Sequence, residues 1–191
     1  SFLQNVNREV TEQVIRLRKH PSLALWCGKN EIDVAWKNWG WSSTYGWGPD
    51  AINWMKGDYD ILFKGMLPEL VEQLHPGAGY VQTSPLSNWG DPADLAHGDN
   101  HFWGVWHGEM PLDSLRTRVP RFMSEYGMQS LPTWSSVERF SNHSDWQADS
   151  PVMQFHQRSY KGNRLIDRYR VMEGDPDPGD DFQAWVKMSH H

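Results

Sequence analysis

The stretch LALWCGKNE, residues 23–31, joins a short apolar run to a polar end. Its first five residues predict a strand at 23–27, of the continuous apolar kind that a parallel sheet buries on both faces. The run then gives way to Gly28, Lys29, Asn30 and Glu31. Because parallel α/β folds bind ligands at the carboxyl ends of their strands, Glu31 is a candidate site residue.

Helical and strand patterns alternate outward from this stretch. Apolar residues recur at helical spacing over residues 5–19 and 58–74, and Pro68 is expected to interrupt the second helix. Further strands are expected at 80–83, 102–106 and 121–125, with a long polar loop at 84–100. The remaining helices are expected in the second half of the chain, at 112–118, 133–140, 151–159, 163–172 and 180–189.

This alternation predicts an α/β fold with a parallel sheet, in one domain or a piece of a larger one. About four strands are visible, whereas a complete eight-stranded barrel has about 250 residues and this chain has 191. The patterns therefore leave two architectures open. The chain is either an open sheet or part of a barrel.

Charge and hydropathy narrow the class of partner. The chain carries 18 Lys and Arg against 24 Asp and Glu, a net charge of −6, and no basic run that could follow a phosphate backbone. Its apolar runs are much shorter than the roughly 20 residues of a membrane helix. Cys27 is the single cysteine and lacks metal-ligand spacing. We therefore expect neither a nucleic acid nor a membrane as partner.

Tryptophan is unusually frequent, with 12 residues in the chain. Several lie beside Gly, Ser or Asn, as in WGW (39–41) and SNWG (87–90), and these are loop contexts. An aromatic ring on a loop offers a flat apolar face and suits an amphipathic ligand such as a sugar. The alternative, that such rings only pack loops onto the body of the protein, is equally compatible with the pattern.

A second predicted strand also ends in an acid, since residues 121–125 end in Glu125. Glycoside hydrolysis needs two carboxylates, one to protonate the leaving oxygen and one to attack or to activate water. Asn30, beside Glu31, supplies an amide that could bond a sugar hydroxyl. The alternative is that each glutamate is an exposed cap or a member of an ion pair, and the spacing alone does not separate the two interpretations.

Four motifs, in order along the chain, resemble the catalytic domain of β-mannosidases in glycoside hydrolase family 2. They are RKHPS (18–22), LWCGKNE (25–31), GDNHFWGVWHG (98–108) and PRFMSEYGMQS (120–130). The Asn-Glu and Ser-Glu-Tyr-Gly segments resemble those of the wider retaining clan, and the third motif resembles the mannosidase branch. The resemblance implies strands four to seven, with their helices, of a (β/α)8 TIM barrel in a larger multidomain glycosidase.

The same resemblance implies roles for individual residues. Glu31 would be the acid/base and Glu125 the nucleophile of a double displacement on a terminal, non-reducing β-D-mannose residue. Asn30 would hold the sugar near its 2-position. No metal or organic cofactor is implied, and the partner would be a mannose-containing oligosaccharide or glycoconjugate. The expected lining of the sugar pocket is Trp89, His101, Trp103, Trp106 and His107.

Two alternatives stay open at this stage. One is another family 2 exo-β-glycosidase that acts on a galactoside, glucuronide or glucosaminide, against which the motif at 98–108 argues. The other is a non-catalytic carbohydrate-binding module whose tryptophans stack on sugar. Because the remaining barrel strands are missing, we expect the isolated segment to be inactive, to expose sheet edges and to be able to self-associate.

Overall fold

A computed structural model of the protein describes residues 1–90, 95–174, 179 and 181–190, which form two compact units. The N-terminal unit contains residues 1–101 and 120–124, and the C-terminal unit contains the described residues of 102–119 and 125–191. The boundary falls inside two strands, β4 and β5, so the chain passes between the units there.

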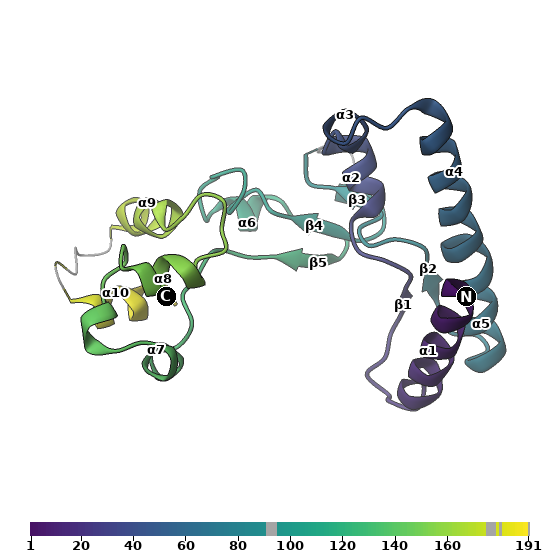
Figure 1. Ribbon diagram of the computed structural model, residues 1–191, viewed down its shortest axis with the longest axis horizontal. Coiled ribbons are helices and arrows are strands. Elements are labelled where there is room, and N and C mark those ends of the chain that lie inside the picture. The colour runs from purple at the N-terminus through teal and green to yellow at the C-terminus, as the bar shows by residue number, and fades with distance from the viewer. Residues whose placement is uncertain (91–94, 175–178, 180, 191) are drawn as a thin grey trace. The chain divides into compact units, whose positions relative to one another are not determined.

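The elements of the N-terminal unit are mostly helices with short strands between them (Figure 1). In chain order they are α1 (Phe2–Leu17), β1 (Trp26–Cys27), α2 (Ile32–Asn38), α3 (Trp41–Thr44), α4 (Pro49–Asp60), the π-helix η1 (Ile61–Met66), α5 (Leu67–Leu74), β2 (Tyr80–Val81), β3 (Ser87–Asn88) and β4 (Asn100–Phe102).

The C-terminal unit is almost entirely helical after its first turns. Its elements are α6 (Ser114–Thr117), β5 (Met123–Tyr126), α7 (Trp134–Phe140), the 3-10 helix η3 (His143–Asp145), α8 (Pro151–His156), α9 (Arg164–Glu173) and α10 (Phe182–Met188). These helices confirm the ones expected in this half of the chain to within a few residues at each end. The first residue of the expected helix at 180–189, Asp180, lies outside the described residues.

The strands form two small sheets, and the β1–β2 and β3–β4 pairings are parallel. Strand β1 pairs with β2, so that Trp26 lies opposite Tyr80, and β3 pairs with β4, so that Asn88 lies opposite His101. The order of the second sheet is β3-β4-β5. Parallel neighbours require a crossover, and helices α2 to α5 supply it between β1 and β2. The expected α/β fold with parallel strands is confirmed.

The apolar run at 23–27 is less buried than expected. Only Trp26 and Cys27 are in β1, and Leu25 keeps 39% of its surface exposed. The physical reason is that β1 has one strand neighbour, β2, among the described residues, so its other edge is uncovered. The prediction of a strand buried on both faces was therefore wrong for this chain.

The crossover also differs from the expected single helix at 58–74. Helix α4 begins at Pro49, and η1 joins it to α5, which carries Pro68 in its first turn. Proline has no N–H to donate, and a π-turn before it relieves the missing bond without ending the helix. Figure 1 shows α1 alongside α5, where Val14, Leu67 and Val71 are buried.

One further strand prediction and one loop prediction require correction. Strand β4 is residues Asn100–Phe102 rather than 102–106, because the chain turns tightly after Phe102 and His107 N–H donates to the Trp103 carbonyl at 2.8 Å. A Cβ on Gly104 would meet Phe102 and Met110, so this turn requires glycine. The expected loop at 84–100 contains β3, which its polar sequence concealed.

The apolar core of the C-terminal unit lies between its helices. The buried members are Val137, Met153, Ile166, Phe182, Trp185 and Val186.

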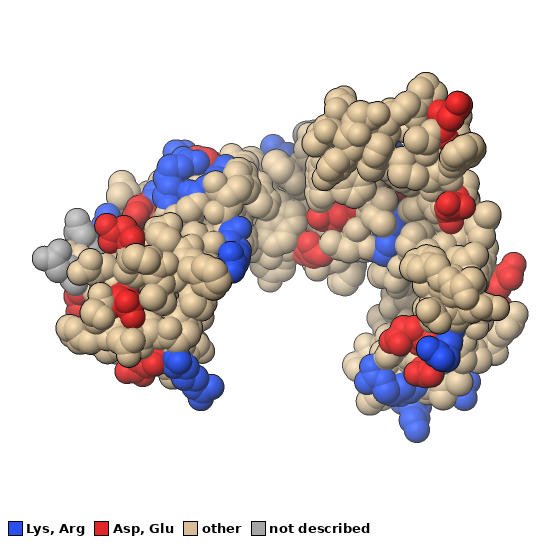
Figure 2. All heavy atoms as spheres, in the orientation of Figure 1, with Lys and Arg blue, Asp and Glu red and all other residues tan. Residues whose placement is uncertain are grey.

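Figure 2 shows Lys and Arg interspersed with Asp and Glu on the face in view. None of the described helices has the length and hydropathy needed to cross a membrane.

Candidate active site

Glu31 lies at the end of the first parallel pairing. Beyond β1, Asn30 bridges Ser84, and Glu31 N–H donates to the Ser84 carbonyl at 2.8 Å, so the chain stays paired as far as the acid. Glu31 is also the N-cap of α2 with a φ of 55°, a left-handed conformation that costs a residue with a side chain about 1–3 kcal/mol. Such strain persists where surrounding contacts fix the backbone, as the bond to Ser84 does.

The Glu31 carboxylate contacts a buried histidine on β4. His101 keeps 2% of its surface exposed, and its Nδ1 lies 2.8 Å from Glu31 Oε1. The other ring nitrogen, Nε2, lies 2.9 Å from Ser84 Oγ. The resemblance places His101 in the lining of the sugar pocket, and in the structure it is a buried residue whose ring meets the predicted acid.

A second carboxylate lies behind this histidine. Asp99 is 8% exposed, and its Oδ2 accepts hydrogen bonds from Ser84 Oγ at 2.6 Å and Ser124 Oγ at 2.7 Å. Its Oδ1 accepts the Leu86 N–H at 2.8 Å. Burial alone would raise the pKa of Asp99, but these hydrogen bonds outweigh it and hold the pKa below its usual value. Asp99 is therefore an ionised carboxylate in the interior of the unit.

Lys29 anchors the segment that leads to Glu31. Its Nζ donates to Thr83 Oγ1 at 3.0 Å, lies 3.3 Å from Asp33 Oδ1, and sits over the Tyr59 ring at 4.5 Å. Burial lowers the pKa of Lys29, and Asp33 partly offsets that effect. Gly28, one residue earlier, has no room for a Cβ, which would meet the Tyr80 hydroxyl and the Gln82 carbonyl. Residues 28 and 29 thus fix the approach to the acid by close packing.

Three of the predicted pocket residues form an aromatic cluster in the C-terminal unit. Trp103 meets Trp106 and His107 edge to face at centroid distances of 5.6 and 5.7 Å, and Trp106 stacks on His107 at 5.4 Å. His107 in turn stacks on Tyr160 at 5.8 Å. Tyr160 is a member of this cluster that the sequence did not indicate.

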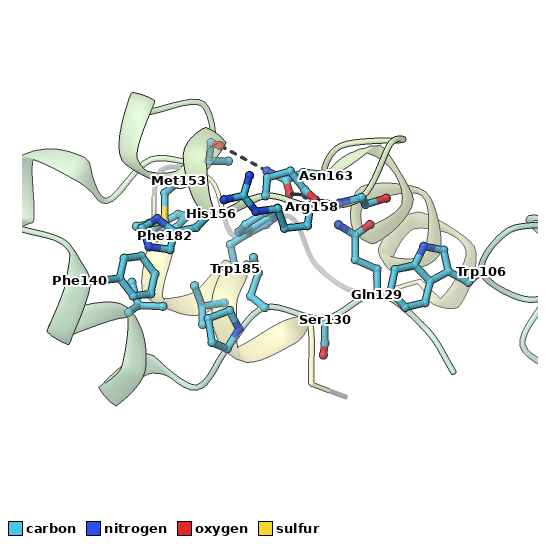
Figure 3. A pocket seen from close by; sticks show the side chains of 17 residues that line it. Trp106, Gln129, Ser130, Phe140, Met153, His156, Arg158, Asn163, Phe182 and Trp185 are labelled. Atoms are coloured by element: carbon cyan, nitrogen blue, oxygen red, sulfur yellow. Dashed lines mark hydrogen bonds between the residues drawn. The ribbon is translucent and has the colours of Figure 1, made fainter. Parts of the chain in front are cut away.

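A cavity of about 310 Å³ lies inside the C-terminal unit (Figure 3). Its wall is largely apolar, with Met153, Phe182 and Trp185 among its members, and Trp106 and Gln129 also line it. Trp106 Nε1 and Gln129 Oε1 are buried and have no hydrogen-bond partner among the residues that the structure describes. Among the eight predicted site residues, Trp106 alone lines this cavity, so the sequence did not predict it as a site.

The remaining predicted residues divide between the units. Asn30 is exposed beside Glu31, and Trp89 lies in the turn after β3, both in the N-terminal unit. Glu125 lies in β5 on the other side of the unit boundary, directly after Ser124. Pairing of Glu31 with Glu125 therefore stays a prediction, as does the assembly of both groups of aromatic residues into one pocket.

The sequence assigned no individual role to Ser84, Asp99 or Ser124. Asp99 and Ser124 lie inside two of the motifs, but their residue types alone are typical of strand ends and turns. The signal that could have found them is Asp99 itself, two residues before His101. If such an acid is buried, its carboxylate requires hydrogen-bond donors nearby. Which donors meet it depends on the register of three segments, and only the folded structure fixes that register.

Fold and site define an α/β protein that carries a hydrogen-bonded Glu–His pair where its short parallel strands end. No family model matches the chain. Curated relatives named β-mannosidase B match it, from Aspergillus fumigatus (34% identity over 178 residues, 90% of this chain) and Thermothelomyces thermophilus (31% over 191 residues, 95% of this chain). The chain spans 21% and 22% of the lengths of these two relatives.

A comparison with solved structures also finds a β-mannosidase. The β-D-mannosidase from Dictyoglomus thermophilum matches 98% of this chain with a TM-score of 0.72 and 28% identity, and the match covers 22% of that protein. The chain is therefore similar to one segment of each of these three β-mannosidases.

Proposed function

We propose that this chain is part of a retaining exo-glycosidase of glycoside hydrolase family 2 that removes terminal, non-reducing β-D-mannose from β-mannosides. Glu31 acts as the acid/base and Glu125 as the nucleophile. The names of the relatives support the mannoside over the other sugars of the family. The chain spans about a fifth of those relatives, so the activity is proposed for a longer protein.

The observation that carries this proposal is the contact between Glu31 and His101. An acid/base must hold a proton, release it to the leaving oxygen and recover one from water. A carboxylate bonded to a buried imidazole at 2.8 Å has a neighbour that can share that proton. An exposed cap or a surface ion pair, the alternative for Glu31, would have no such buried partner.

We further propose that the chain forms strands four to seven of a (β/α)8 barrel. On this assignment β1, β2, β4 and β5 are barrel strands, and Glu31 and Glu125 end the first and last of them. The uncovered edge of β1 is what such an excerpt would leave. The isolated 191-residue chain is expected to show no turnover of a chromogenic β-mannoside, and robust turnover would contradict this assignment.

The test of the catalytic roles uses the full-length gene product. We expect Glu31→Gln to lower kcat on an alkyl or oligosaccharide mannoside by about 10²–10⁴-fold, the usual contribution of general acid–base catalysis. With a dinitrophenyl mannoside, whose leaving group needs no proton, the glycosylation step should be nearly spared. Glu125→Gln should abolish turnover of both substrates, because no leaving group replaces a missing nucleophile.

Two measurements complete the test. A 2-deoxy-2-fluoro mannoside should label Glu125 covalently, and labelling of another residue would refute the assignment. Glu69→Gln, a change of an exposed glutamate on α5, is the matched control and should keep full activity. Binding of mannosides without hydrolysis by the full-length protein would instead indicate a carbohydrate-binding module.

A further inference from the structure

The cavity of about 310 Å³ in the C-terminal unit is formed largely by side chains of the apolar core, and all of the residues that line it lie in this unit. Val137, Met153, Phe182 and Trp185 belong both to the core and to the cavity wall. An apolar cavity of about 150 Å³ can hold one benzene ring, and ligand pockets begin at about 300 Å³. This cavity therefore has room for a molecule of about two rings.

Several polar side chains in the wall already have hydrogen-bond partners. The Trp185 indole N–H donates to Asp167 Oδ1 at 3.0 Å, and Gln157 Nε2 donates to Asn163 Oδ1 at 2.6 Å. Asn163 Nδ2 donates in turn to the Ala148 carbonyl at 3.3 Å. A ligand would gain little from these groups, because each would first have to give up an existing hydrogen bond.

Two polar atoms of the same wall differ from these. Trp106 Nε1 and Gln129 Oε1 are buried and have no hydrogen-bond partner among the described residues, and Gln129 keeps only 6% of its surface exposed. Figure 3 shows both side chains toward the right of the view, with Phe140 and Met153 toward the left. A buried donor and a buried acceptor are unfavourable unless something in the cavity bonds to them.

A molecule with a hydroxyl at one end and an apolar body suits both parts of the wall. Water alone suits only the polar part, because a buried water needs two to four polar contacts and apolar cavities stay dry. A hydroxyl can accept the Trp106 N–H and donate to the Gln129 amide oxygen. It also bonds to either end of that amide, so the match does not depend on which way the amide is turned.

The charge of the wall favours a neutral ligand. Arg158 is the one Lys, Arg, Asp or Glu among the described residues that line the cavity, and it is exposed, with its guanidinium 5.1 Å from the centroid of the Phe155 ring. A charged group buried near Gln129 would lose its hydration without gaining an opposite charge. A sugar is equally unsuited, because most of its hydroxyls would face apolar side chains.

We propose that this cavity binds a neutral phenol or alcohol with an apolar body of about two rings, and that Trp106 Nε1 and Gln129 Oε1 bond to its hydroxyl. The site goes beyond the proposed hydrolysis. It is built within the C-terminal unit and needs neither Glu31 nor Glu125, so either proposal can fail without the other.

Equilibrium dialysis of the 191-residue chain against 2-naphthol and naphthalene tests the proposal, because these probes share two fused rings and differ in one hydroxyl. We expect 2-naphthol to have a dissociation constant about 2–10-fold lower, the usual gain from a neutral hydrogen bond. Equal binding of the two probes, or no binding of 2-naphthol up to its solubility limit, overturns the proposal. Tighter binding of 2-naphthoate than of 2-naphthol also overturns it, in favour of an acid held by Arg158.

Two variants test which atoms bind the hydroxyl. Gln129→Met keeps the length of the side chain and removes the acceptor, and Trp106→Phe keeps an aromatic ring and removes the N–H. In each variant naphthalene should still bind, which shows that the cavity is intact, whereas the advantage of 2-naphthol should fall to about 1-fold or less. Gln73→Met, at an exposed glutamine on α5, is the matched control and should keep the full advantage.

An advantage of 2-naphthol that survives in either folded variant overturns the proposal, and if one variant does not fold the other decides. The indole N–H signal of Trp106 in a proton–nitrogen NMR spectrum, assigned by its loss in Trp106→Phe, locates the ligand. It should shift with 2-naphthol and shift less with naphthalene, while the signal of Trp54, which is 77% exposed, should stay in place. Binding of 2-naphthol without a shift at Trp106 would place the ligand elsewhere and contradict the proposal.

Discussion

In the N-terminal unit many of the buried residues near the strands are polar, whereas the C-terminal unit buries an apolar cluster between its helices. The first group is Lys29, Thr83, Ser87, Asp99, Asn100 and His101. The second is the cluster around Trp185. Apolar packing is nearly non-directional, but each buried polar group needs a partner at a fixed distance and angle. The stability of the N-terminal unit therefore depends on the register of its strands, and that of the C-terminal unit depends on how well side chains fill the volume of its core.

The sharpest way to break the C-terminal unit is to remove its largest core side chain. Trp185→Ala deletes an indole that is 8% exposed and stacks on Phe182 at 5.7 Å. We expect a loss of about 3–5 kcal/mol in the free energy of unfolding, from lost burial and the cavity that remains. Urea denaturation measures it. The control Trp54→Ala, at a ring that is 77% exposed, should change stability by only about 0.5 kcal/mol.

The corresponding change in the N-terminal unit removes a charge and keeps most of the volume. Lys29→Met leaves Thr83 and Asp33 without their shared donor, and we expect a loss of about 1–3 kcal/mol in the free energy of unfolding. Lys64→Met is the matched control, because Lys64 pairs with Asp60 on the surface, with side chains 47% and 54% exposed. Equal losses in the two variants would show that burial of Lys29 is not what matters.

The smallest effect is expected where the C-terminal unit carries charge. Hydrogen bonds from Arg164 and Lys161 lower the pKa of Glu109 to about 2, whereas its usual pKa is 4.5. Between these two pH values Glu109 is ionised in the folded protein but binds a proton in the unfolded chain. The stabilisation is complete above about pH 4.5 and is lost as the pH falls toward 2.

Glu109→Gln should therefore flatten the decline of stability over that pH range, as followed by acid denaturation. Glu138→Gln, at an exposed glutamate on α7, should leave the decline unchanged. An unaltered acid profile in Glu109→Gln would mean that solvent screens the ion pairs with Lys161 and Arg164 completely.

Local patterns in the sequence predicted the helices well. The helix that apolar spacing predicts at 5–19 is present as α1, and α7 to α10 were predicted in the same way. This works because the buried face of a helix is visible as a periodic pattern of apolar residues in its own sequence. Helices α2 and α3 were missed, and each begins after a residue in the left-handed conformation, without a side-chain cap that the sequence would show. The strands were predicted too long, because their ends depend on neighbours far away in the chain.

By itself the sequence determined the helices, the alternation that gives an α/β fold, and Glu31 as an acid at the end of a strand. Only the tertiary structure decided that Glu31 meets His101, that Ser84 and Asp99 stand behind that histidine, and that the acid has a left-handed backbone. These contacts join residues 15 to 70 positions apart. Hydrogen bonds act over about 3 Å, so a contact between distant residues exists only once folding has set the register of the segments that carry them.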